Sequence, residues 1–118
     1  MIRPLPTSER YRAGDVVVVP FPYSDRLAEK RRPALVVSND GLAAQGFIWV
    51  AMITSAAQAA CDGDELIADP AGAGLTVACR VRPSKIACIE PSRILRRVGR
   101  LEAAAFARVG AAIRGWLG

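Results

Sequence analysis

The chain has 118 residues, of which 52% are hydrophobic, and it carries a net charge of +5 without any histidine. A chain of this length can bury the core of one domain without a structural metal or disulfide bonds. Its hydrophobic content excludes a wholly disordered protein. The positive charge favours a polyanionic partner such as a nucleic acid.

Cysteine usage and the N-terminus both favour a reducing cytoplasm. Cys61, Cys79 and Cys88 are an odd number without C-x-x-C spacing, so we expect no disulfide framework, no metal site and no cofactor. The first residues lack an apolar signal-peptide region, and no apolar run reaches the roughly 18 residues that span a membrane. We therefore predict a cytoplasmic protein without membrane contact.

The first half of the chain predicts short strands joined by turns. Residues 1–13 are expected to form an N-terminal arm, and residues 14–118 a single domain. A long polar loop covers residues 21–30, and Asn39-Asp40-Gly41 is a strong turn signal. Strands are predicted at Val16–Val19, ended by Pro20, at Ala34–Ser38, and at Phe47–Ile53 with Thr54-Ser55 at its end, and a helical turn at Leu42–Gln45.

The second half adds weaker strands and one long helix. We predict a strand at Glu65–Ala68, two strands at Cys79–Arg82 and Ile86–Ile89 with a turn at Pro83-Ser84 between them, and a helical turn at Pro91–Ile94. From Leu101 to Trp116 apolar residues recur at helical spacing, which predicts an amphipathic helix packed on the sheet. The fold class is therefore mainly β (α+β), a small barrel-like domain with a C-terminal helix.

Two segments are rich in cations. Lys30-Arg31-Arg32 runs into Pro33, and proline is tolerated at the first residue of a strand. Arg32 would then lie at the mouth of the second strand, that is, at its start, where the N–H donors of its planar guanidinium suit phosphate oxygens. The other interpretation is that the three cations form a solvated charge cluster. Residues 80–100 hold seven cations against one acid, which is the expected footprint for phosphate contacts.

Several segments, taken in order, resemble the MazF/PemK-type toxins, the endoribonuclease half of type II toxin–antitoxin pairs. The resemblance covers about residues 14–117, and its ordered set of segments is more specific than any one of them. The segments are Gly14-Asp15-Val16-Val17-Val18-Val19-Pro20-Phe21-Pro22-Tyr23-Ser24-Asp25, Lys30-Arg31-Arg32-Pro33-Ala34-Leu35-Val36-Val37-Ser38, Ala51-Met52-Ile53-Thr54-Ser55, Gly74-Leu75 through Val81-Arg82-Pro83 with Lys85-Ile86, and Arg97-Val98-Gly99-Arg100-Leu101.

The resemblance implies an SH3-like barrel of the CcdB/PemK plasmid-maintenance type, usually a homodimer. It also implies sequence-selective, metal-independent cleavage of single-stranded RNA, and a cognate antitoxin of the MazE type that is acidic and partly disordered. The family's catalytic pair is an arginine before the proline of the second strand and a threonine that ends the third strand. This pair falls on Arg32 and Thr54.

Such cleavage uses the ribose 2′-hydroxyl as nucleophile and leaves a cyclic phosphate and a 5′-hydroxyl. Because the chain has no histidine, an imidazole acid–base pair is excluded. Arg32 would stabilise the charge of the phosphate, and Thr54 would donate a hydrogen bond to a phosphate oxygen. The alternative for Thr54 is a hydroxyl that bonds the local backbone. Asp25 or Glu29 could act as the general base, or either could simply be solvated.

Further RNA contacts are expected from polar side chains near this pair and from aromatic rings that stack on bases: Lys30, Arg31, Ser55, Arg82, Lys85, Phe21 and Tyr23. Trp49 is a further candidate for stacking on a base, but because it lies on an apolar strand it is expected in the core. The chain departs from relatives at Ser84, where some carry an acid, and at Cys79 and Cys88, where hydroxyl residues are common. Both cysteines are expected to line the core.

Two other functions remain as alternatives. The same superfamily includes CcdB-like poisons of DNA gyrase, and Gly115-Trp116-Leu117-Gly118 is loosely similar to their aromatic C-terminus, but they lack the Arg-Pro and Thr-Ser motifs. A non-catalytic RNA-binding domain would bind RNA in a salt-sensitive manner and leave it intact.

Overall fold

The computed structural model describes residues 10–21 and 30–118. Three of the predicted site residues, Tyr23, Asp25 and Glu29, lie outside these ranges, as do most of the predicted N-terminal arm and of the first loop.

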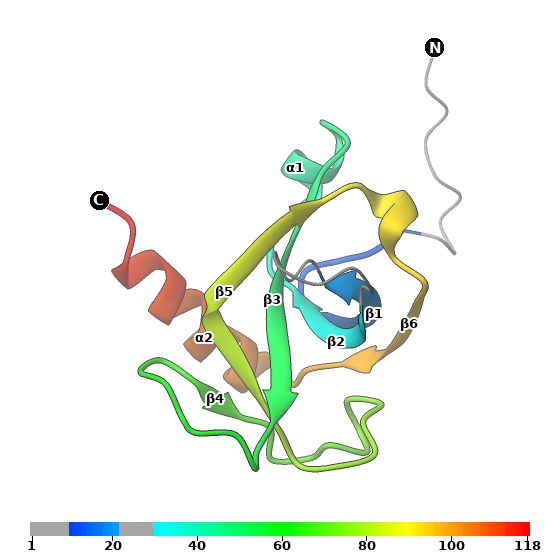
Figure 1. Ribbon diagram of the computed structural model, residues 1–118. Coiled ribbons are helices and arrows are strands. Elements are labelled where there is room, and N and C mark those ends of the chain that lie inside the picture. Colours follow the sequence, from blue (N-terminus) through cyan, green and yellow to red (C-terminus); the bar gives the residue numbers. More distant parts are fainter. Residues whose placement is uncertain (1–9, 22–29) are drawn as a thin grey trace.

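Six antiparallel strands form one curled sheet in the spatial order β4-β5-β3-β2-β1-β6 (Figure 1). Among the described residues no ladder joins the edge strands β4 and β6, so the sheet is an open half-barrel. The strands are β1 (Asp15–Phe21), β2 (Lys30–Val36), β3 (Ile48–Ser55), β4 (Glu65–Leu66), β5 (Cys79–Ile89) and β6 (Arg96–Arg100). The helices are α1 (Asp40–Ala43), the 3₁₀ turn η2 (Pro91–Arg93) and α2 (Ala103–Gly115).

These elements confirm the predicted mainly β class with a C-terminal helix. The helical turns expected near residues 42–45 and 91–94 are α1 and η2, and the long helix begins two residues later than expected, at Ala103. No helix within residues 10–21 and 30–118 has the length and apolar character needed to cross a membrane.

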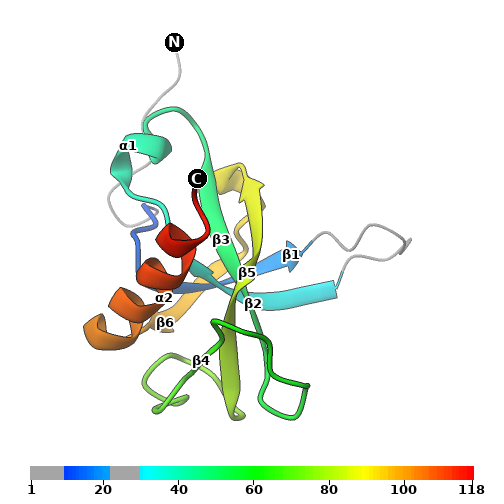
Figure 2. The same cartoon turned by 90° about the vertical axis from the view of Figure 1, so that its left-hand side faces the viewer.

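Each face of the sheet carries an apolar core of its own. On one face, which we call the helix face, Leu35, Ile53 and Val81 pack with Ala105 and Val109 of α2. On the other, the far face, the buried cluster consists of Val17, Val19, Ala34, Val36, Ile48, Val50, Met52 and Ile94. Figure 2 shows α2 on one side of the strands. Because successive residues of a strand alternate between its two faces, these clusters also assign the polar strand residues to a face.

Pro33 lies inside β2, and the prediction that it begins the strand is wrong. β2 begins at Lys30, and Pro33 is the ladder partner of Val18 in β1. The ladder between β2 and β3 starts only at Ala34, so β2 is paired on one side alone at Pro33, and a proline is tolerated there. Arg32 is therefore a half-buried residue within a paired strand rather than the mouth of one.

One long strand replaces the two strands predicted around Pro83. β5 pairs with β3 on both sides of this proline, but Met52 is opposite Arg82 whereas the adjacent Ala51 is opposite Ile86. Residues 83–85 are therefore a bulge within β5, and the predicted turn is wrong. Proline is compatible with either arrangement, and only the pairing with β3 decides between them.

β6 has no counterpart among the predicted strands. Its five residues include three arginines and a glycine, which carry little strand propensity. Its pairing with β1 places two of those arginines on the buried carboxylate of Asp15, with Arg97 Nη1 at 3.1 Å and Arg100 Nη1 at 2.6 Å. Tertiary pairing therefore makes a strand of this segment.

Candidate active site

Arg32 and Thr54 lie on the same face of the sheet, near the end of one ladder. The β2–β3 ladder ends at the pair Ala34 and Met52, both of which belong to the far-face core. Arg32 and Thr54 are each two residues beyond that pair along their strands, so their side chains point to the same face. Arg32 is half-buried, and Thr54 is only 5% exposed.

The strands separate at this point. β1 and β2 run together to one side, whereas the end of β3 stays beside β5 (Figure 2). Arg32 and Thr54 thus approach the same region from two diverging pairs of strands. A ligand held between them would be contacted from both sides.

The Thr54 hydroxyl makes no hydrogen bond with any residue that the structure describes. The alternative in which it bonds the local backbone therefore finds no support. The Thr54 side chain is nearly buried, but its hydroxyl oxygen is not among the buried polar atoms that lack a partner, so this oxygen stays accessible to solvent and to a substrate oxygen.

Arg80 is the residue nearest to Thr54 in the ladders, and the sequence did not single it out. It is the direct ladder partner of Thr54 on the β5 side. Its Nη2 donates to the Ala56 carbonyl oxygen at 3.1 Å, and its Nε is buried without a hydrogen-bond partner in the described chain. The spacing of Arg80 and Arg82, two apart on one strand, was the available signal that both face the same way.

Arg82 is engaged by the segment that follows β3. Its Nη2 lies 2.9 Å from Asp64 Oδ2 and donates to the Ala59 carbonyl oxygen at 2.7 Å. Burial alone would raise the pKa of Asp64. The hydrogen bonds from Arg82 and from the Cys61 backbone, with the charges of Arg82 and Arg80, outweigh burial and hold that pKa below its usual range. Arg82 therefore fastens residues 56–64, which we call the β3–β4 loop.

The remaining predicted contacts do not all gather near Thr54. Ser55 is the ladder partner of Cys79, whose side chain is in the helix-face core, and the Ser55 Oγ accepts the Ala57 N–H at 3.2 Å. Arg31 is exposed and alternates with Arg32, so it points to the opposite face, and Lys85 is exposed in the β5 bulge. Phe21 and Lys30 are strand residues.

Two expectations about the core are wrong. Trp49 is 46% exposed and belongs to neither core cluster, and its ladder partner Cys88 is exposed as well. Cys79, in contrast, is buried as expected, and burial raises the pKa of its thiol. Within residues 10–21 and 30–118 no three histidine, cysteine, aspartate or glutamate side chains gather as a metal site would require.

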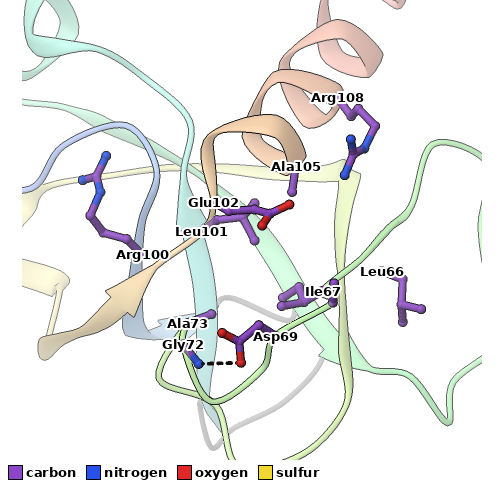
Figure 3. A pocket seen from close by; sticks show the side chains of 11 residues that line it. Leu66, Ile67, Asp69, Gly72, Ala73, Arg100, Leu101, Glu102, Ala105 and Arg108 are labelled. Atoms are coloured by element: carbon purple, nitrogen blue, oxygen red, sulfur yellow. Dashed lines mark hydrogen bonds between the residues drawn. The ribbon is translucent and has the colours of Figure 1, made fainter.

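A pocket of about 270 Å³ lies away from this site (Figure 3). It is bounded by β4, the turn at Asp69–Ala73 and the start of α2, and its lining includes the charged residues Asp69, Arg100, Glu102 and Arg108. No predicted site residue lines it. The pocket lies beside α2 and neither Arg32 nor Thr54 lines it, so it is distinct from the candidate active site.

Comparison with known proteins gives one consistent result. A family model described as PemK-like, MazF-like toxin of type II toxin–antitoxin system matches residues 12–117. No curated protein sequence matches the chain. Solved structures of similar shape include three that are each less than 25% identical in sequence to this chain. At that level of identity they show the fold alone.

The Mycobacterium tuberculosis toxin MazF-mt6 is 20% identical with a TM-score of 0.68, over 86% of this chain and 93% of that one. MazF from Deinococcus radiodurans is 23% identical with a TM-score of 0.70, over 89% and 94%. An endoribonuclease from a mycobacterial species, in complex with its cognate antitoxin, is 15% identical with a TM-score of 0.69, over 92% and 99%.

Proposed function

Since the chain belongs to the PemK-like, MazF-like toxins of type II toxin–antitoxin systems, we propose that it is an endoribonuclease that cleaves single-stranded RNA without a metal and thereby stops translation. The observation that carries this proposal is the placement of Arg32 and Thr54 on one face of the sheet, where β2 and β3 separate.

The reaction needs little from the protein beyond charge stabilisation and proton transfer. The ribose 2′-oxygen attacks phosphorus, the bond to the 5′-oxygen breaks, and a 2′,3′-cyclic phosphate and a 5′-hydroxyl result. The Arg32 guanidinium offers a fixed fork of donors to the non-bridging oxygens, but arginine keeps its proton in proteins and is therefore a poor proton donor. The Thr54 hydroxyl adds a hydrogen bond as the phosphate gains charge.

Two proton transfers complete the chemistry. One group removes the 2′-hydroxyl proton and another protonates the departing 5′-oxygen. Asp25 and Glu29 are the proposed candidates for the base. Lys30, Lys85, Phe21 and Tyr23 are the proposed RNA contacts. The sequence also suggests Ser55, Arg31 and Arg82, but Ser55 and Arg31 alternate away from the face that carries Thr54 and Arg32, and Arg82 is paired with Asp64.

The proposed partners follow from the family. The solved structures include MazE–MazF from Deinococcus radiodurans and a mycobacterial endoribonuclease with its cognate antitoxin. We propose an equivalent antitoxin here, acidic and partly disordered, which would complement the net charge of +5. A homodimer and a cytoplasmic location complete the proposal.

The test is cleavage of a mixed-sequence single-stranded RNA by purified protein in EDTA. We expect discrete fragments with cyclic-phosphate ends, and a loss of about 10²–10³ in rate for Arg32→Ala. Arg31→Ala is the matched control, because it removes the same charge from the adjacent residue on the opposite face and should leave most of the activity.

Folded wild-type protein that binds RNA but never cuts it would instead favour a non-catalytic RNA-binding domain. Inhibition of DNA gyrase with no effect on RNA would favour the CcdB-like alternative. Equal loss of activity in Arg31→Ala and Arg32→Ala would contradict the assignment of Arg32.

A further inference from the structure

We propose that Arg80 is an RNA-binding residue of this site, holding a phosphate group against Thr54, and that Arg82 serves instead to fasten the β3–β4 loop. This inference rests on the ribonuclease function proposed above, and it changes which arginine of β5 contacts the substrate.

The register of the sheet places Arg80 beside the proposed phosphate position. Arg80 and Thr54 are direct partners in the β3–β5 ladder, and such partners have Cβ atoms about 4.5–5.5 Å apart on the same face. Arg32 approaches from the β2 side of β3. Thr54 of β3 therefore lies between β2, which carries Arg32, and β5, which carries Arg80.

The hydrogen bonds of Arg80 leave most of its donors uncommitted. Of the five N–H groups of an arginine, one at Nη2 is used by the Ala56 carbonyl oxygen. Nε is buried and has no partner within the described residues, and no carboxylate there forms an ion pair with Arg80. The charge of Asp64 acts on Arg80 only from a distance, and a half-buried cation with unused donors and no direct ion pair is suited to an anion that arrives with the substrate.

Arg82 has the opposite character. Its guanidinium binds both oxygens of Asp64, with Nε to Oδ1 at 3.3 Å and Nη2 to Oδ2 at 2.9 Å. The side chains of this pair are only 13% and 4% exposed. A phosphate would have to displace a buried carboxylate to reach Arg82, and the charge of this arginine is already balanced.

The ligand class follows from the donors. Arginine has no acceptor, so two guanidinium groups and a hydroxyl donor select a group that only accepts hydrogen bonds and carries negative charge. A non-bridging phosphate oxygen of RNA meets this requirement. An uncharged base edge does not balance the charge of Arg80.

The experiment measures binding of a mixed-sequence single-stranded RNA in which 2′-O-methyl riboses remove the nucleophile, so that binding is separated from cleavage. Dissociation constants are measured in EDTA over a series of salt concentrations. Arg80→Gln should weaken binding about tenfold and reduce the slope of log K against log [salt] by about 0.7, which is the loss of one phosphate contact on a single strand.

Arg82→Gln is the matched control, since it makes the same charge change two residues away on the same strand and face. Below its melting temperature it should keep the wild-type salt slope. Arg80→Lys retains one charge and serves as the second variant should Arg80→Gln not fold. It should keep the wild-type slope and lose affinity, because lysine lacks the fork.

An unchanged dissociation constant and slope in Arg80→Gln, with RNA cleavage by the wild type intact, would overturn this inference and leave the ribonuclease function standing. A reduced slope in Arg82→Gln but not in Arg80→Gln would reverse the assignment of the two arginines and so overturn it. A wild-type protein that neither binds nor cleaves RNA would overturn the proposed function itself, and the inference with it.

Discussion

The Nη2 atom of Arg82 lies 2.9 Å from Oδ2 of Asp64, and this ion pair ties β5 to the loop that leaves β3. The same loop also contacts α2, because a Cβ added at Gly63 would lie 2.8 Å from the indole of Trp116. The β3–β4 loop is thus held at two points, by an arginine of the far face and by the end of the helix. Its stability should depend on both.

Removing the charge of Asp64 should destabilise the fold. Asp64→Asn leaves Arg82 largely buried without its counter-charge, which we expect to cost about 3 kcal/mol in the free energy of unfolding. Urea denaturation near pH 7 measures this loss. Glu65→Gln is the control, since it breaks an ion pair with Arg108 whose arginine is 58% exposed, and it should cost much less. Equal losses in the two variants would contradict a structural role for the Arg82–Asp64 pair.

The stability that Asp64 provides should disappear in acid. The folded-state pKa of Asp64 is lowered below its ordinary value of 3.8, so the unfolded chain binds the proton first as the pH falls. Its contribution is therefore complete above about pH 5, where the unfolded carboxyl is ionised as well, and it is lost as the pH drops through the lowered pKa. Denaturation of wild type and Asp64→Asn from pH 7 to pH 2 should show the difference between them shrinking at the acid end. A difference in unfolding free energy between the two proteins that stays constant from pH 7 to pH 2 would contradict a contribution of the Asp64 charge to stability.

Removing the Thr54 hydroxyl should affect cleavage far more than folding. Thr54→Val keeps the shape of a nearly buried strand residue and should lower the rate of RNA cleavage by about 10²–10³. Thr54→Ser restores a hydroxyl and should recover most of the rate. Ser55→Ala is the neighbouring control, because the Ser55 Oγ accepts the Ala57 N–H at 3.2 Å on the other side of the strand. If Thr54→Val cut RNA as fast as wild type, Thr54 would have no part in the chemistry.

Glycine should be required at position 74 for two reasons. Its φ is +82°, and a Cβ there would overlap the carbonyl oxygen of Val98 in β6. Gly46 also has a positive φ, of +91°, but a Cβ there would meet no atom within 4 Å. Gly46→Ala should therefore cost only the roughly 1–2 kcal/mol of the left-handed backbone, whereas Gly74→Ala should cost clearly more. Thermal unfolding of the two variants compares them directly, and similar melting temperatures would argue against the overlap.

Local patterns in the sequence determined most of the elements. The β-branched run at Val16–Val19 lies in β1, the turn residues at 39–41 cap and begin α1, and the helical spacing after Leu101 becomes α2. Each of these patterns acts over a few neighbouring residues. The family resemblance also came from the sequence, because it depends on the order of short segments. Through it, the order of short segments alone is enough to propose Arg32 and Thr54 as a pair.

Only the tertiary structure decided how these pieces pair. Whether Pro83 marks a turn or a bulge, whether Arg96–Arg100 is a strand, and which arginine of β5 is opposite Thr54 depend on partners distant in the chain. Side-chain alternation places Arg80 and Arg82 on one face, but the sequence does not reveal that Asp64 forms its ion pair with Arg82 and none with Arg80. Register and ion pairing are set by non-local contacts, so they are properties of the folded sheet rather than of any segment.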